Sequence, residues 1–119
     1  MMRFKLWHLR LKDPGRIEEL RREGTAWSNP YVVLLGLPGE PGKLRVAFSS
    51  SRKIGKIVHR NRARRLLREA VRLNQHHIKK GWDLLFIAKA GLAEASFEQA
   101  QEAVREVLKK AHLWQEEID

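Results

Sequence analysis

The 119-residue sequence contains no cysteine, which excludes disulfide bonds, thiolate metal sites and cysteine nucleophiles. Long apolar runs are also missing, since the longest, from Tyr31 to Leu37, is far too short to span a bilayer. The N-terminal stretch lacks both a long apolar core and a small-residue cleavage site, so it predicts no secretory signal. These absences favour a cytoplasmic protein.

Acidic residues are scarce in the part of the chain where basic residues are most numerous. Residues 52–72 hold nine Lys or Arg and a single acid, Glu69, which gives a local net charge of +8 within a formal total of +10. The remaining 98 residues carry 15 basic and 13 acidic side chains and are nearly neutral. Charge concentrated in this way indicates a polyanionic partner, either a nucleic acid or an anionic membrane surface.

Length and patterning predict a single domain over residues 1–119. Residues 1–12 alternate basic and apolar side chains, and we interpret them as a loose basic arm or a short strand without assigning a structure. Asp13 and Pro14 are typical of a helix start, and this helix is expected to run to about Glu23 and to end at Gly24.

Four segments have the pattern of β-strands. Residues 25–28 read as a short edge strand, and residues 31–36 and 43–50 lie on either side of a turn rich in proline and glycine. We expect these three strands to form an antiparallel hairpin or meander. Residues 83–89 are an almost unbroken apolar run, which predicts a central strand covered on both faces and reached through a β-α-β crossover.

A last helix is expected from the capping box of Ser96 and Gln99 to about Leu113. Its apolar stripe consists of Phe97, Ala100, Val104, Val107, Leu108 and Ala111. The chain from Gly91 onward carries seven acids and three bases, so this helix is not expected to bind the polyanion.

The basic segment combines a loop with a helix that begins near Val58. The loop, framed by serines and Gly55, carries Arg52, Lys53 and Lys56. The helix has an apolar stripe made of Ala63, Leu66, Leu67, Ala70 and Val71. The opposite side carries a ridge made of Asn61, Arg64 or Arg65, Arg68 and Arg72.

Runs of charge are usually only solvated faces, but three features of this segment favour anion binding. Seven of its nine bases are arginine, whose guanidinium forks onto phosphate oxygens. Acids that would neutralise the helix are missing. The loop also places cations at the helix N-terminus, where free backbone N–H groups favour phosphate.

No group of residues has the spacing of a catalytic site. The five histidines are scattered, and the adjacent pair His76 and His77 diverges by about 100° on a helix. The acids show neither paired-carboxylate nor Asp-rich spacing, as a protein nuclease would need to hold Mg²⁺. We therefore predict no catalytic residue and no metal ligand in this chain. Among the aromatic residues, Trp82 and Phe86 are expected in the core, and Trp27 and Tyr31 are candidates for ligand contact.

The segment from Ser51 to Glu69 reads S-R-K-I-G-K-I-V-H-R-N-R-A-R-R-L-L-R-E. It resembles the RNR motif of the bacterial ribonuclease P protein family, which typically reads S-K-K-x-G-x-A-V-x-R-N-R-x-K-R-x-x-R-E. The order of elements resembles that family over nearly the whole chain. The resemblance implies an α+β fold of the ribosomal-protein type: an α-β-β-β-α-β-α sandwich with helices packed on a four-stranded mixed sheet and a left-handed β-α-β crossover.

The resemblance also implies a function. Proteins of the family assemble with a catalytic RNA, which holds Mg²⁺ and removes the 5′ leader of precursor tRNA, so neither DNA, a membrane nor a small-molecule substrate is expected as a partner. The RNA-binding residues implied by the motif and the ridge are Arg52, Lys53, Lys56, Arg60, Asn61, Arg62, Arg64, Arg65, Arg68 and Arg72. Arg52 and Arg64 replace the commoner lysine, and Ile57 stands where the family prefers alanine.

In the family, a cleft between the N-terminal helix and the sheet contacts the leader. Aromatic side chains often line this cleft from the helix, but the corresponding positions here are Ile17 and Arg21. Trp27, Tyr31 and Leu35 on the neighbouring strands are the alternative lining residues.

Three other functions are compatible with a basic domain of this size. A structural RNA-binding protein of the ribosomal type has the same composition, and the RNA that copurifies would discriminate it. A protein that places a helix in the DNA major groove is expected to contain a helix-turn-helix or a dimer seam, and the sequence shows neither pattern. A free-standing nuclease would cleave without added RNA.

Overall fold

The computed structural model describes residues 9–116, so most of the predicted N-terminal arm, residues 1–8, lies outside the described part. The elements are α1 (Pro14–Glu23), β1 (Thr25–Ser28), β2 (Val32–Pro38), β3 (Leu44–Ser50), α2 (Ile57–Asn74), β4 (Trp82–Ala88) and α3 (Phe97–Lys110). Short 3₁₀ turns η2 (Arg52–Ile54), η3 (Gln75–His77) and η4 (Ala90–Glu94) lie between them. The predicted α-β-β-β-α-β-α order is confirmed.

Capping follows the sequence signals at both ends of the chain. The Asp13 side chain accepts a hydrogen bond from the Gly15 N–H at 2.9 Å and starts α1. Ser96 and Gln99 form the expected reciprocal capping box at the start of α3. α3 ends at Lys110, three residues earlier than expected, and His112 then adopts a positive φ of 57°, which is incompatible with a continuing helix.

The sheet has the strand order β1-β2-β4-β3, in which β2 is antiparallel to both β1 and β4, and β3 is parallel to β4. The predicted central position of residues 83–89 and the β-α-β crossover through α2 are both confirmed. The predicted hairpin or meander is confirmed for β1 with β2 but is wrong for β2 with β3, because β4 lies between these two strands.

The connection from β2 to β3 shows how the central strand separates them. The Gly39 N–H donates to the Gly81 carbonyl at 2.9 Å, and the Gly81 N–H donates to the Lys43 carbonyl at 2.6 Å. The turn cluster is therefore bound across the start of β4 instead of closing a two-stranded hairpin. Because β4 is largely apolar on both faces, a central position in the sheet buries more of its apolar surface than an edge position would.

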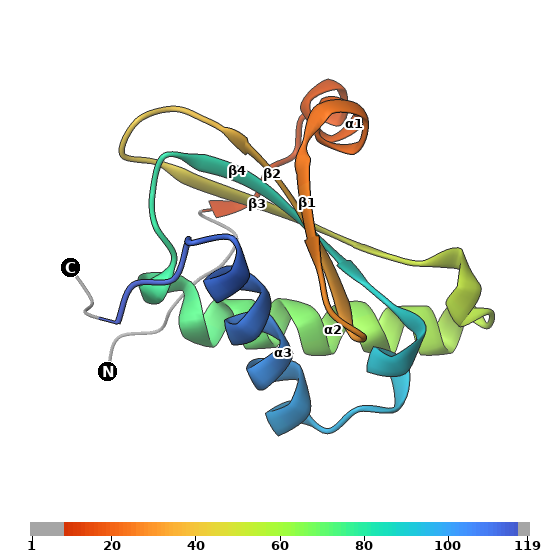
Figure 1. The fold of residues 1–119 in the computed structure, drawn as a ribbon. Helices are drawn as coiled ribbons and strands as arrows, with labels where there is room; N and C mark the ends of the chain where they lie inside the picture. Colours follow the sequence, from red (N-terminus) through yellow and green to blue (C-terminus); the bar gives the residue numbers. More distant parts are fainter. Residues whose placement is uncertain (1–8, 117–119) are drawn as a thin grey trace.

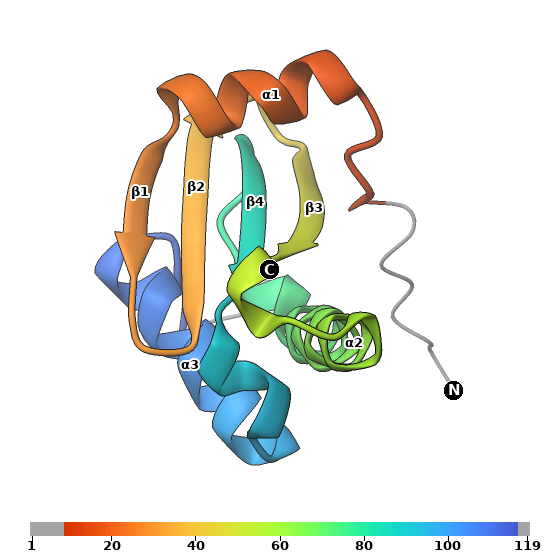
Figure 2. The same cartoon turned by 90° about the vertical axis from the view of Figure 1, so that its right-hand side faces the viewer.

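Helices cover both faces of the sheet, as Figures 1 and 2 show. On one face, α2 and α3 pack on residues such as Leu34, Val46 and Phe86 to form the main core. On the other face, α1 packs through Leu20 on a smaller cluster that includes Leu85. Phe86 is fully buried, as predicted, whereas Trp82 is only partly buried. None of the helices within residues 9–116 has the length and apolar character needed to cross a bilayer.

Candidate nucleic-acid interface

The basic segment, residues 52–72, forms η2 and nearly all of α2. The Ser51 hydroxyl accepts a hydrogen bond from the Lys53 N–H at 3.2 Å, which orders the turn. Gly55 then adopts a φ of 86°, a conformation that other residues rarely take, and redirects the chain into α2. Four of the five predicted stripe residues of α2 are buried and Leu66 is partly buried. Because the stripe faces the core, the arginine-rich side of α2 faces solvent.

The cations of this surface fall into two groups. Five are exposed, and their side chains make no hydrogen bond or ion pair with any other residue of 9–116; they are Arg52, Lys53, Lys56, Arg65 and Arg68. We call these five side chains the free basic set. Lys56 is the N-cap residue of α2 and gives no side-chain hydrogen bond, so the first-turn N–H groups of α2 add to the positive potential.

The other motif side chains are partly engaged inside the protein. Arg62 donates to the carbonyl oxygens of Ala93 and Ala95 in and after η4, the second at 3.3 Å, and braces α2 against this turn. The Arg64 guanidinium donates to the side-chain oxygen of Asn61.

Arg72 and Arg60 have different surroundings. Arg72 pairs with Glu69, and this hydrogen bond lowers the pKa of the Glu69 carboxyl. The charge of Arg72 is thus locally balanced, and the unbalanced part of the ridge ends at Arg68. Arg60 is partly buried, and its Nε has no hydrogen-bond partner among the described residues.

A groove on the α1 face of the sheet adjoins the free basic set. It has a volume of about 890 Å³ and lies beside α1, at the ends of β3 and β4. The lining residues are Glu18, Arg21, Pro30, Val33, Ser49, Ser50, Ser51, Arg52, Lys53, Ile87, Lys89, Ala90 and Gly91. Arg21 donates from Nη2 to the Ser49 hydroxyl at 3.1 Å and so reaches from α1 toward β3. Because Arg52 and Lys53 belong to both, the groove and the basic surface are continuous.

The structure separates the five residues predicted to line a leader cleft. Arg21 lines the groove, and Ile17 and Leu35 pack on the small cluster beneath α1. Trp27 and Tyr31 pack on the main core at the opposite face. Since Trp27 is paired with Leu34 across β1 and β2, its side chain points to the layer of α2 and α3. Trp27 therefore does not share a surface with α1, whereas the Tyr31 ring also lies beside Gly91, which lines the groove.

The groove has lining residues that the sequence alone did not single out, including Val33, Ile87, Ser49 and Lys89. Val33 and Ile87 are direct partners in the β2–β4 pairing, and Ser49 is the partner of Ile87 in the β3–β4 pairing. The alternation of these residues along each strand can be read from the sequence, but their contact depends on the strand order. They lie together only because β4 pairs with both β2 and β3.

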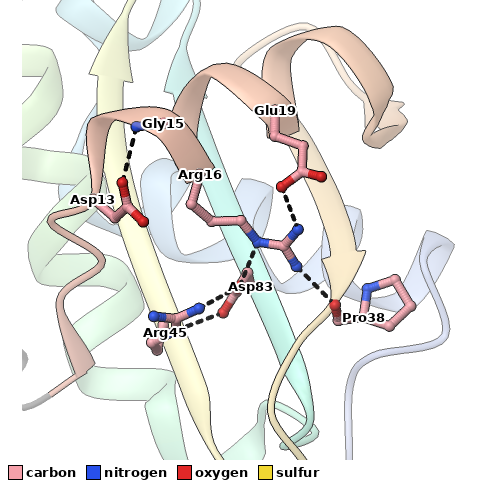
Figure 3. Close-up of polar contacts among 7 residues, drawn as sticks. All are labelled: Asp13, Gly15, Arg16, Glu19, Pro38, Arg45 and Asp83. Atoms are coloured by element: carbon pink, nitrogen blue, oxygen red, sulfur yellow. Dashed lines mark hydrogen bonds and ion pairs between the residues drawn. The ribbon is translucent and has the colours of Figure 1, made fainter.

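A buried ionic network holds α1 against the sheet (Figure 3). The Asp83 carboxylate, only 1% exposed, accepts from Arg45 Nε at 2.9 Å and Nη2 at 2.7 Å, and from Arg16 Nε at 2.7 Å. Arg16 also donates to Glu19 at 2.7 Å and to the Pro38 carbonyl at 2.8 Å. One carboxylate thus joins α1 to β3 and β4 on the face that carries the groove.

Burial raises the pKa of the Asp83 carboxyl, but hydrogen bonds from Arg45 and Arg16 and their positive charges outweigh it, so the pKa lies below the ordinary 3.8. Because both carboxylate oxygens are bonded to arginine, Asp83 has no free oxygen for a metal ion. Within residues 9–116, no group of three or more His, Asp or Glu side chains is arranged to hold a metal.

We expect the Asp83 network to make the protein acid-sensitive in a defined pH range. A carboxyl whose pKa is lowered in the native state contributes its full stabilisation at pH values above its unfolded-state pKa of about 3.8. That contribution is lost as the pH falls through the native-state pKa. Urea unfolding of the protein and of Asp83→Asn should therefore differ most above pH 5, with the difference shrinking below about pH 4. A difference that stayed constant down to pH 2 would contradict this assignment.

The fold and this surface define a small α+β protein whose exposed basic helix is suited to bind a polyanion. The family model described as Ribonuclease P matches residues 7–112, and the chain belongs to the ribonuclease P protein family. The resemblance carried by the RNR motif is thereby confirmed.

Relatives and solved structures agree with this assignment. The "Ribonuclease P protein component" of Herpetosiphon aurantiacus is 39% identical over 105 residues, covering 88% of this chain and 85% of that protein. The protein of the same name from Caldanaerobacter subterraneus is 36% identical and covers 97% of both chains. The RNase P protein structure from Staphylococcus aureus has a TM-score of 0.77 at 25% identity, covering 99% of this chain and 100% of that one. The structure from Thermotoga maritima has a TM-score of 0.74 at 28% identity, covering 85% and 96%.

Proposed function

We propose that this chain is the protein subunit of a ribonuclease P ribonucleoprotein, which removes the 5′ leader of precursor tRNA. The observation that supports this most directly is the free basic set, five exposed cations that have no partner among residues 9–116, on a chain of this family. Cations that form no ion pair with a carboxylate of the described residues are available to phosphates, and their binding releases counterions from the RNA. The catalytic RNA is the proposed partner of this surface.

The groove beside α1 is the proposed site for the leader. A single-stranded leader exposes both phosphates and base faces, and the groove is lined both by cations and by the apolar strand residues Val33 and Ile87. Arg21 stands where the family often has an aromatic residue, and a guanidinium contacts phosphates or stacks on bases. We therefore propose a leader contact that is more electrostatic than aromatic on the α1 side.

The chemistry is proposed to reside in the RNA, which would hold most of the Mg²⁺ ions. Asp83, the buried carboxylate of this protein, is occupied by two arginines, and the exposed acids do not converge on a metal position within residues 9–116. The protein would contribute positive charge where RNA strands approach one another. Part of the Mg²⁺ that screens this repulsion then becomes unnecessary.

A cleavage assay with a bacterial ribonuclease P RNA and precursor tRNA tests the proposed function. At near-physiological salt, the protein should allow cleavage at the mature 5′ end at Mg²⁺ concentrations several-fold below those that the RNA needs alone. The protein without RNA should release no product. An absence of stimulation across the whole Mg²⁺ titration would refute the proposal, and RNA binding without stimulation would favour the structural RNA-binding alternative.

A further inference from the structure

Two large apolar side chains are exposed within the basic surface. Ile57 and Val58, the first two residues of α2, are 67% and 63% exposed. The third exposed large apolar side chain of residues 9–116 is Leu73, 41% exposed near the other end of the same helix. Exposed apolar residues that stand singly need no explanation, but an adjacent pair inside a cationic surface calls for one.

The pair lies on the side of α2 that carries the arginine ridge, not on the buried stripe. Ile57 precedes Asn61 by four residues and Arg68 by eleven, and Val58 precedes Arg65 by seven, so each stands above a ridge residue along the helix axis. The fully buried residues of α2 start at Ala63. Packing within the described protein therefore gives no reason for apolar side chains at these two positions.

Local helix stability gives no reason either. Valine and isoleucine are not favourable residues for a helix, since their branched side chains lose rotamer freedom against the preceding turn. The first turn of α2 also lacks a side-chain N-cap hydrogen bond, so capping does not offset this cost. An apolar pair kept at an exposed and weakly stabilised helix start is best explained by a contact outside the chain.

We infer that Ile57 and Val58 pack against an unpaired nucleobase of the bound RNA, between the phosphates that the neighbouring cations hold. This inference rests on the proposed function. RNA is the occupant that fits because Lys56 precedes the pair directly and Lys53 and Arg65 belong to the same cationic surface. An apolar protein partner would bury these charges without counterions, which is strongly unfavourable. Unpaired bases in loops and bulges offer an apolar face that duplex RNA does not.

The test measures binding of the full-length protein to a bacterial ribonuclease P RNA over a series of salt concentrations, for Ile57→Ser and Val58→Ser. Each variant should bind about tenfold more weakly at every salt concentration, because its complex with the RNA buries one apolar side chain fewer. The slope of log affinity against log salt should not change, because no charge is removed. Leu73→Ser, on the same helix but distant from the pair, should bind like the unmodified protein.

Two further measurements separate this inference from its alternatives. On a fully paired RNA duplex, both serine variants should bind like the unmodified protein, and Ile57→Leu should retain affinity for the ribonuclease P RNA. Serine variants that match the unmodified protein on ribonuclease P RNA, or that lose affinity equally on the duplex, would overturn the inference. So would a dimer in sedimentation that becomes monomeric in the variants, since the occupant would then be a second copy. If the unmodified protein itself fails to bind ribonuclease P RNA, the proposed function fails as well.

Discussion

Asp83→Asn is expected to lower the free energy of unfolding by about 2–4 kcal/mol. The carboxylate is almost fully buried and pairs with two arginines, so the substitution leaves Arg45 without an ion pair and Arg16 with only the exposed Glu19. The expected loss lies toward the lower end of the range for broken buried pairs because Arg16 and Arg45 are 20% and 41% exposed and can turn toward water. For a domain of this size, the melting temperature should fall by on the order of 10 °C.

Glu19→Gln is the matched control for this prediction. Glu19 also binds Arg16, at 2.7 Å, but its side chain is 39% exposed, so its loss should cost less than about 1 kcal/mol. Urea unfolding of both variants at pH 7 gives the comparison. Equal losses would mean that burial does not set the strength of the network. A loss below 1 kcal/mol for Asp83→Asn would show that the network does not hold α1 on the sheet.

Asp83→Asn is also expected to change the groove beside α1. Arg16 belongs to α1, which also provides the groove residues Glu18 and Arg21. Gly39 packs so closely on Asp83 that a β-carbon there would lie 2.8 Å from a carboxylate oxygen, which leaves no space for a larger residue. Loss of the network should therefore loosen one wall of the proposed leader site while the free basic set keeps its place on η2 and α2.

Joint replacement of Arg65 and Arg68 by alanine is expected to weaken binding to ribonuclease P RNA by about a hundredfold at moderate salt. Each side chain is exposed and unpaired within residues 9–116, and a hydrogen bond to a charged group stabilises by about 1.5 kcal/mol at the low end of its range, which is roughly tenfold in affinity. The slope of log affinity against log salt should fall by about one unit for each arginine. Either single variant should show about half of this change in slope.

Arg105→Ala removes the same charge from α3, whose neighbouring residues are acidic, and is the control for this experiment. Arg105 pairs with Glu102 at 3.1 Å and lies outside the basic segment, so its removal should leave both affinity and slope nearly unchanged. An unchanged slope in the Arg65 and Arg68 variants would remove the two residues from the interface. Equal changes in all the variants would mean that net charge alone, and not the ridge, controls binding.

Much of the molecule could be predicted because it follows from local chemistry. Asp13 starts α1 and the pair Ser96 and Gln99 starts α3 as expected, since caps depend on neighbours a few residues away. The stripe from Ala63 to Val71 faces the core, since period and burial agree over several turns. The motif spacing identified the family, and the helical period separated residues that face the core from residues that face solvent.

The errors concern residues that meet across long separations. β2 and β3 looked like a hairpin because they are neighbours in sequence, yet β4 lies between them. Trp27 was an alternative lining residue for a cleft beside α1, yet the β1–β2 register sends its side chain to the other face of the sheet. Arg16 and Asp83 are 67 residues apart and gave no signal of pairing in either segment.

The sequence by itself determined the elements, the basic segment and its division into a buried and an exposed side, and the family. Helix caps, hydrophobic period and the concentration of charge are all properties of neighbouring residues. Only the tertiary structure decided which cations remain free, where the groove lies and which carboxylate holds α1. These depend on the order and register of four strands, which follow from the apolar area buried by the whole sheet and not from any one segment.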